Sequence, residues 1–191
     1  MRLPPLLVLT DRSQCARPLV DVVAAAVEAG ARAVVLREKD LFEAQRSRLA
    51  ERLRKVLEPV DGLLILAGPC GEAVHLSAKD TFPLRPPPLV GRSCHSTEEV
   101  AAARAEGCDY VTISPIFATA SKPNYGPALG TTGLATLAAT APPAYALGGV
   151  QPPDVADCLA AGATGIAVMG PIMRTPQLVT AYLIALQQDP R

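Results

Sequence analysis

The chain has 191 residues, enough for one hydrophobic core and short for two, so we expect a single domain spanning residues 1–191. Eighteen basic and eighteen acidic side chains give a formal net charge of zero, which excludes the broad positive field that nucleic-acid binding uses. No segment is long and apolar enough to span a membrane, and the five cysteines are scattered without paired spacing, so we expect a reduced, cytoplasmic protein.

Short apolar runs typical of buried strands recur along the chain, at residues 6–10, 33–37, 63–66, 73–76, 89–93, 110–113, 144–147 and 165–169. Alanine-rich amphipathic stretches of helical length lie between most of them, at residues 19–29, 42–57, 97–106, 132–139 and 153–161. Strands that alternate with helices predict a parallel sheet, and continuous apolar strands predict that both faces of the sheet are covered.

Three of the predicted helices end in a glycine that is followed by a small residue and a new strand, in EAGARAVVL, AEGCDYVTI and AAGATGIAV. A glycine just past a helix can adopt the left-handed conformation that caps the last turn. Eight strands, several of them preceded by this helix–glycine–strand pattern, predict an α/β fold of the (β/α)8 TIM-barrel type. An open doubly wound sheet is the alternative. Residues 67–72 are too few for a helical crossover and residues 77–88 are proline-rich, so we expect the barrel to be trimmed around its third and fourth helices.

The residues that follow the carboxyl ends of the strands line the active-site mouth in a barrel of this kind. Both histidines of the chain, His75 and His95, fall at such positions, and so does Ser93. A histidine at a mouth can carry protons, although each could instead be a buried structural residue. The charged and hydroxyl side chains predicted at the same mouth are Asp11, Arg12, Arg37, Glu38, Lys39, Asp40, Ser77 and Asp80.

Two groups of residues at this mouth suit phosphate oxygens. Strand alternation places Arg37 and Lys39 on one side of their strand, and the later segment 114–122 adds donors at Thr119, Ser121 and Lys122. The loops ALGGV and AVMGPIM bring backbone donors to the mouth at Gly148, Gly149, Met169 and Gly170. We therefore expect a phosphorylated ligand and a second anionic group, with a solvated charge cluster and simple tight turns as the alternatives.

These segments together resemble one superfamily, that of thiamine phosphate synthase and thiazole tautomerase. Its motifs appear in the same order and spacing as VVLREKD, VHLSAKD, VGRSCHSTEEV, DYVTISPIFATASKP, ALGGV and GATGIAVMGPI. The resemblance implies a small (β/α)8 barrel that binds a thiazole phosphate in the loops after the seventh and eighth strands. In the synthase branch it also implies that the loop matching residues 118–122 closes over the pyrophosphate of an aminopyrimidine, with Lys122 in contact.

The chain departs from the synthase pattern where that branch binds Mg²⁺. The synthase has a glutamine at the position of Val35 and an Asn-Asp pair where residues 67–69 are Ala-Gly-Pro, so Asp80 remains as the one matching metal ligand. A lone aspartate makes a weak magnesium site, because Mg²⁺ prefers several oxygen ligands in octahedral geometry. We therefore expect no cofactor, and Mg²⁺ at Asp80 only if the protein is a synthase.

The tautomerase branch is the closer match, because GRSCHS at residues 91–96 resembles its motif and because that branch also lacks the Asn-Asp pair. Its reaction aromatises a thiazole carboxylate phosphate by moving a proton, which needs an acid and a base but no metal. The resemblance assigns these roles to Glu38 and to a histidine whose position is taken by Pro115. His75 or His95 would then be the second proton carrier.

The sequence thus predicts a tautomerase-like enzyme that binds a small-molecule thiazole phosphate, with Glu38, His75 and His95 as catalytic residues. Thiamine phosphate synthase is the alternative enzyme, and a non-catalytic ligand-binding or regulatory homologue is the alternative outside catalysis. No nucleic-acid or membrane partner is expected, and the oligomeric state is left open, a homodimer included. The predicted substrate-binding residues are Arg37, Lys39, Ser93, Thr119, Ser121, Lys122, Gly148, Gly149, Met169 and Gly170.

Overall fold

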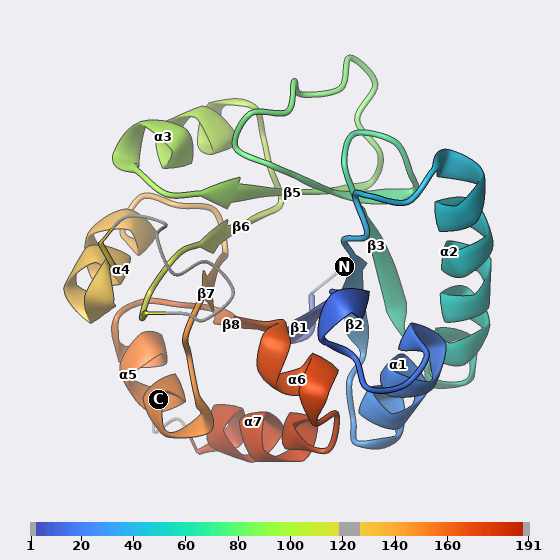
Figure 1. The fold of residues 1–191 in the computed structure, drawn as a ribbon. Helices are drawn as coiled ribbons and strands as arrows, with labels where there is room; N and C mark the ends of the chain where they lie inside the picture. Colours follow the sequence, from blue (N-terminus) through green and yellow to red (C-terminus); the bar gives the residue numbers. More distant parts are fainter. Residues whose placement is uncertain (1–2, 119–126, 189–191) are drawn as a thin grey trace.

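The computed structural model describes residues 3–118 and 127–188, and its strands form a closed parallel barrel (Figure 1). Neighbouring strands pair in chain order, and the last strand pairs with the first through Leu6 and Ile166. The closure confirms the predicted (β/α)8 class, because an open doubly wound sheet would leave two unpaired edges. The strands are β1 (Leu6–Leu9), β2 (Ala33–Leu36), β3 (Leu63–Ala67), β4 (Ala73–Leu76), β5 (Leu89–Cys94), β6 (Tyr110–Ile113), β7 (Ala144–Leu147) and β8 (Gly165–Val168).

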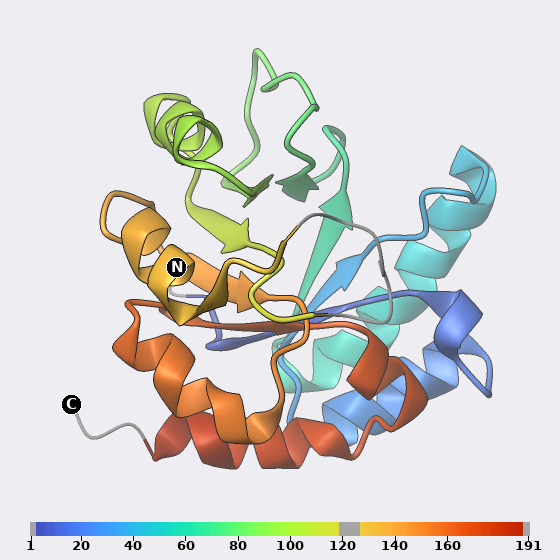
Figure 2. The same ribbon diagram turned by 60° about the vertical axis from the view of Figure 1, so that its left-hand side comes forward.

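Helices surround the barrel on its outer side (Figures 1 and 2). The five predicted helical stretches are confirmed to within two residues at each end, as α1 (Leu19–Glu28), α2 (Glu43–Leu57), α3 (Thr97–Ala105), α4 (Gly130–Ala138) and η3 (Pro152–Asp154) continuing into α5 (Val155–Ala160). The structure adds the short turns η1 (Arg12–Gln14) and η2 (Glu58–Val60) and two helices after β8, α6 (Gly170–Arg174) and α7 (Leu178–Gln187).

The barrel is trimmed where the sequence predicts it. Residues 68–72, which connect β3 to β4, contain no helix, and neither do residues 77–88, which connect β4 to β5. Figure 2 shows the second of these connections as an irregular loop above the barrel. The cluster of prolines in this loop accounts for its irregularity, because proline lacks the N–H that a helix interior requires.

Two apolar layers stabilise the barrel, and strand alternation separates them. The outer layer packs side chains such as Val8, Val34 and Val111 against the helices. The inner layer fills the barrel interior and includes Tyr110 and Tyr145, whose rings meet edge to face with their centroids 5.7 Å apart. These large rings fill the interior, so the barrel is a packed core with its opening at the carboxyl ends of the strands.

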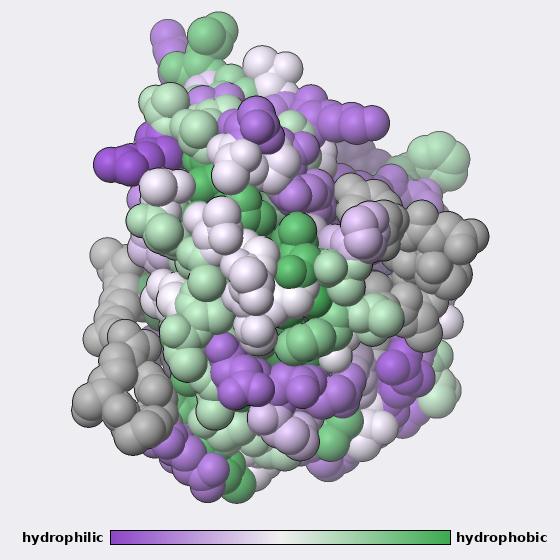
Figure 3. Space-filling model, turned by 90° about the vertical axis from the view of Figure 1, so that its left-hand side faces the viewer, coloured by the Kyte–Doolittle hydropathy of each residue, from purple (hydrophilic) through white to green (hydrophobic). Residues whose placement is uncertain are grey.

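The outer surface is chemically mixed. On the face seen in Figure 3, which is the left-hand side of Figure 1, hydrophilic and apolar residues are interspersed. Within residues 3–118 and 127–188, no helix combines the length and the apolar character needed to cross a bilayer.

Candidate active site

A cavity of about 630 Å³ opens at the carboxyl ends of the strands. Most of the predicted site residues line it, which confirms that the chain brings them together. These residues are Arg37, Lys39, His75, Ser93, His95, Gly148, Gly149, Met169 and Gly170. Thr119, Ser121 and Lys122 lie outside the described residues. The cavity is also lined by Lys79 and Arg174, which the sequence does not predict at the site, and by Ser114, the first residue of the predicted segment 114–122.

The basic wall of the cavity comes from the end of β2. Val35, Arg37 and Lys39 all line the cavity, as strand alternation predicts. The backbone N–H of Arg37 donates to Thr10 Oγ1 at 2.9 Å, which ties the end of β2 to the end of β1. The Arg37 guanidinium Nη1 lies 3.8 Å from Met169 Sδ, a weak acceptor, so its charge stays directed at the cavity.

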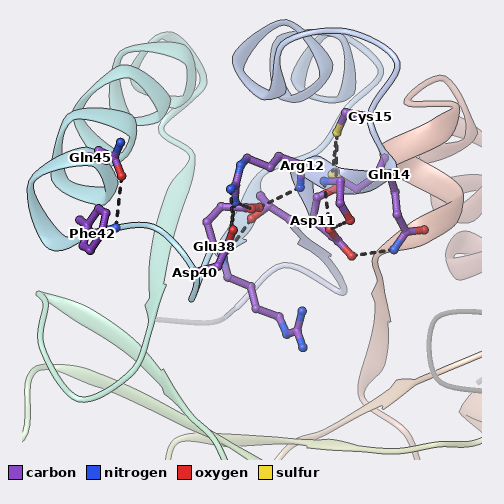
Figure 4. A network of polar contacts seen from close by, with 12 residues as sticks. Asp11, Arg12, Gln14, Cys15, Glu38, Asp40, Phe42 and Gln45 are labelled. Atoms are coloured by element: carbon purple, nitrogen blue, oxygen red, sulfur yellow. Dashed lines mark hydrogen bonds and ion pairs between the residues drawn. The ribbon is translucent and has the colours of Figure 1, made fainter. Parts of the chain in front are cut away.

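Glu38 faces the opposite side of the same strand end and does not line the cavity. Its buried carboxylate accepts from the backbone N–H of Arg12 at 3.1 Å and forms an ion pair with the Arg12 guanidinium at 2.9 Å. The same guanidinium pairs with Asp40 at 2.5 Å (Figure 4). The geometry therefore places Glu38 outside the cavity, where it joins the loops after β1 and β2, and its role as a proton carrier stays a prediction.

The loop after β1 continues this network towards α6. Asp11, which lines the cavity, accepts from Ser13 Oγ at 2.6 Å and from Gln14 Nε2 at 2.8 Å (Figure 4). Gln14 in turn accepts from the Arg174 guanidinium at the end of α6. Burial alone would raise the pKa of Asp11, but the donors of Ser13 and Gln14 and the charge of Arg37 together hold it below its usual value.

His75 is buried at the wall of the cavity between two hydroxyl groups. Its Nδ1 lies 3.0 Å from the Tyr110 hydroxyl and its Nε2 lies 2.9 Å from Ser93 Oγ. Burial, together with the charges of Lys39 and Arg37, lowers the pKa of His75 to about 4. The imidazole is therefore neutral at pH 7, so it can donate through one nitrogen and accept through the other.

His95 is held in one tautomer. Its Nδ1 lies 2.6 Å from the carbonyl oxygen of Ser114, and because a carbonyl can only accept, this nitrogen carries the hydrogen. The backbone N–H of His95 also donates to Glu99 Oε2 at 2.6 Å. These contacts fix the ring at the rim of the cavity, next to Ser114 and Pro115.

The loop after β7 presents backbone atoms to the cavity, because its glycines have no side chains. Gly149 has a φ of 71°, and a Cβ at this position would lie 2.5 Å from the carbonyl oxygen of Ala118. The close approach of the backbone at residues 117–118 is therefore enough to require glycine at position 149, with or without a ligand. A bulky residue at Gly149 would push this loop away, so it would disturb the cavity whether or not a phosphate binds there.

The loop after β8 adds a second edge of backbone to the cavity. Gly170 begins α6 and lines the cavity, and a Cβ there would meet Gln14 Oε1 at 2.7 Å. Arg174 lies one helical turn later and also lines the cavity. A phosphate at this edge would meet backbone N–H groups and one guanidinium, which is the kind of donor set that phosphate oxygens prefer.

The donors near the ends of β3 and β4 do not fit a protein-held magnesium ion. Ala67, Gly68 and Pro69 offer no side-chain oxygen, and the carbonyl of Ala67 accepts from the Arg46 guanidinium. The Asp80 carboxylate accepts the backbone N–H of Ser77 at 2.7 Å. Burial would raise the pKa of Asp80, but the Ser77 donors and the charges of Lys39 and Arg92 outweigh it and lower the pKa. Within the described residues, no three His, Cys, Asp or Glu side chains lie close enough to hold a metal.

Comparison with known proteins relates this cavity to one family. A family model described as thiamine monophosphate synthase matches residues 6–172. A putative thiamine-phosphate synthase of Geobacter sulfurreducens is 35% identical over 192 residues, which cover 90% of this chain and 87% of the relative. The thiamine-phosphate synthase of Methanoregula boonei is 35% identical over 179 residues, covering 86% and 83%. The solved structure of thiamine phosphate pyrophosphorylase from Pyrococcus furiosus has a TM-score of 0.83 at 24% identity, covering 96% and 95%.

Proposed function

The chain belongs to the thiamine monophosphate synthase family, and from this membership we propose that it joins an aminopyrimidine, carried as a pyrophosphate ester, to a thiazole phosphate. One observation carries the proposal: a single cavity has basic side chains on the β2 wall and glycine backbone at the ends of β7 and β8. Two anionic groups can therefore bind in the same cavity, as the two substrates of a synthase require. This reading replaces the tautomerase as the first choice, because the named relatives are synthases.

In this proposal, different residues of the cavity bind the two substrates. The thiazole phosphate binds the backbone of Gly148, Gly149 and Gly170 beside Arg174, and the pyrophosphate binds at Arg37 and Lys39. The carbon–oxygen bond to pyrophosphate breaks with its electron pair leaving on the pyrophosphate, and the thiazole nitrogen supplies the pair for the new carbon–nitrogen bond. The cations of β2 stabilise the charge that gathers on the departing group.

Proton transfer on a thiazole carboxylate phosphate is the second candidate function. The neutral His75, hydrogen-bonded to Ser93 at the wall of the cavity, supports it because such an imidazole can accept or donate a proton. Two observations count against it: Glu38 faces away from the cavity, and Pro115 stands where the resemblance expects a histidine. We place either reaction in the cytoplasm.

Incubating the purified protein with both synthase substrates, and separately with the thiazole carboxylate phosphate alone, tests the two enzymatic functions. We expect thiamine phosphate in the first reaction, detected by chromatography, and a much lower yield from Arg37→Gln. Arg48→Gln is the matched control, because Arg48 is exposed on α2, away from the cavity. Aromatised product from the second reaction without thiamine phosphate in the first would favour the tautomerase. Ligand binding without product would favour a non-catalytic homologue.

A further inference from the structure

The cavity has an excess of positive charge that the internal contacts of the protein do not neutralise. Among the residues that the structure describes, four basic side chains line it, Arg37, Lys39, Lys79 and Arg174, against the single carboxylate of Asp11. Asp11 is already satisfied by Ser13 and Gln14. Within the part of the chain that the structure describes, Lys39 and Lys79 form no ion pair closer than 4 Å. A protein with no net charge has thus concentrated cations in one cavity, which is the electrostatic condition for a multivalent anion.

Lys79 is aimed at this cavity by a rigid turn. The turn is closed by the backbone N–H of Asp80, which donates to the Ser77 carbonyl at 3.2 Å, and by the Asp80 carboxylate, which accepts from the Ser77 N–H. Arg92, buried on β5, holds the turn from below by donating to the carbonyl oxygens of Ser77 at 3.1 Å and Asp80 at 2.9 Å. The base of Lys79 is therefore fixed, while its exposed ammonium group stays available to a ligand.

A cation also occupies the neighbouring corner at the end of β3. The Arg46 guanidinium, from α2, donates to the Ala67 carbonyl oxygen, and Ala67 itself lines the cavity. A divalent metal beside the Ala67 carbonyl would meet the Arg46 guanidinium, and like charges repel. The segments that follow β2 and β4 thus bring Arg37, Lys39 and Lys79 to the cavity, where a metal-dependent site would need acidic side chains.

We infer that Lys79, with Arg37 and Lys39, forms a subsite that binds a pyrophosphate group without a metal ion. This inference rests on the proposed function, because that function supplies the pyrophosphate ester. Three cations can match the charge that a pyrophosphate carries near neutral pH, so the pyrophosphate requires no Mg²⁺ to enter the cavity. Lys79 takes the part that a metal ion would otherwise play in neutralising the group.

Titration calorimetry with inorganic pyrophosphate tests the subsite on the full chain. We expect binding in EDTA, and no tighter binding when EDTA is replaced by excess Mg²⁺, because Mg²⁺ complexes pyrophosphate in solution and lowers its negative charge. Lys79→Gln should weaken binding roughly tenfold, in the range of a lost charge-assisted contact. Lys55→Gln on α2 is the matched control, because Lys55 is exposed and outside the cavity, and it should bind as the unaltered protein does.

Two results would overturn the subsite: pyrophosphate binding that appears only with Mg²⁺, or equal affinities for the Lys79→Gln and Lys55→Gln proteins. Circular dichroism of both variants confirms folding before titration. The failure of the proposed function is separate, since it is measured as thiamine phosphate formation from the two substrates. A protein that binds pyrophosphate in EDTA but forms no thiamine phosphate would keep the subsite and refute the synthase.

Discussion

Adjacent residues at the end of β2 direct their side chains to opposite sides of the strand. Arg37 and Lys39 line the cavity, whereas Glu38 between them is buried against Arg12 on the other side. The alternation follows from the pleat of a strand, in which successive side chains point to opposite faces. The sequence motif REK therefore combines two ligand-facing cations with one carboxylate that holds the loops after β1 and β2 together.

His75 makes stability depend on pH in a defined direction. Burial lowers its pKa to about 4 in the folded protein, below its ordinary value of 6.5. The unfolded chain therefore binds more protons between these two values, so the stability that neutral His75 contributes is complete above pH 6.5 and is lost as the pH falls towards 4. The full loss is roughly 3 kcal/mol.

Urea unfolding of the unaltered protein and of His75→Gln, each at neutral pH and at about pH 4.5, measures this contribution. His75→Gln should be less stable at neutral pH, because the contacts to Tyr110 and Ser93 are altered, yet it should lose less stability on acidification. The carboxylates titrate in both proteins, so the difference isolates His75. Equal losses in the two proteins would show that His75 is not held neutral by the fold.

At the scale of elements, irregular connections position the site as firmly as helices do. The loop of residues 77–88 has no helix, yet Arg92 fixes its first turn and also pairs with Glu106 at the end of α3 at 2.8 Å. The glycines after α1, α3 and α5 end those helices with positive φ values of 113°, 77° and 92° at Gly30, Gly107 and Gly162. The glycine that follows each of these helices in the sequence thus correctly predicts a left-handed helix cap at all three positions.

Arg92→Met should destabilise the protein by about 2–4 kcal/mol, because it removes the donors that Arg92 supplies to the Ser77 and Asp80 carbonyl oxygens and leaves Glu106 without its partner. It should also weaken pyrophosphate binding, since the backbone turn that carries Lys79 is then no longer held in place. Chemical denaturation and calorimetry measure the two effects. Arg104→Met on α3, where the arginine is exposed, should change stability by less than about 0.5 kcal/mol. Equal stabilities of the Arg92→Met and Arg104→Met proteins would show that Arg92 does not hold the turn of residues 77–80.

At the scale of the whole molecule, contacts between distant parts of the chain close the barrel and support the cavity. The first strand pairs with the last, and the Tyr145 hydroxyl donates to the Pro4 carbonyl oxygen at 3.0 Å. On the outer side, α7 packs on α5, and the buried Tyr182 hydroxyl donates to the carbonyl oxygen of Val150 at 2.8 Å. Val150 follows Gly149 and lines the cavity, so the last helix supports the loop after β7.

Tyr182→Phe should therefore lower both stability and ligand affinity. Losing the hydroxyl leaves a buried carbonyl unpaired, which costs about 1–2 kcal/mol, and it loosens the loop that holds the thiazole phosphate. Tyr145→Phe is the comparison, because it removes a hydroxyl bonded near the amino ends of the strands, away from the cavity. Denaturation should show losses in both variants, whereas calorimetry with the thiazole phosphate should show weaker binding only for Tyr182→Phe. Unchanged affinity of that variant would mean that α7 does not support the site.

The sequence by itself determined the eight strands, the trimmed connections, the location of the mouth and the inward direction of Arg37 and Lys39. These follow from periodicity and turn chemistry, which are local properties of the chain. The helix α7 was missed, because its sequence LVTAYLIALQ is apolar nearly all round and shows no polar face to mark it. Only the tertiary structure decided that Glu38 pairs with Arg12, that His75 is buried and neutral, and that Gly149 is required by the backbone of residues 117–118. Each of these depends on which distant segment packs against the residue, because burial and partner charges, rather than residue type, set its protonation and its freedom to move.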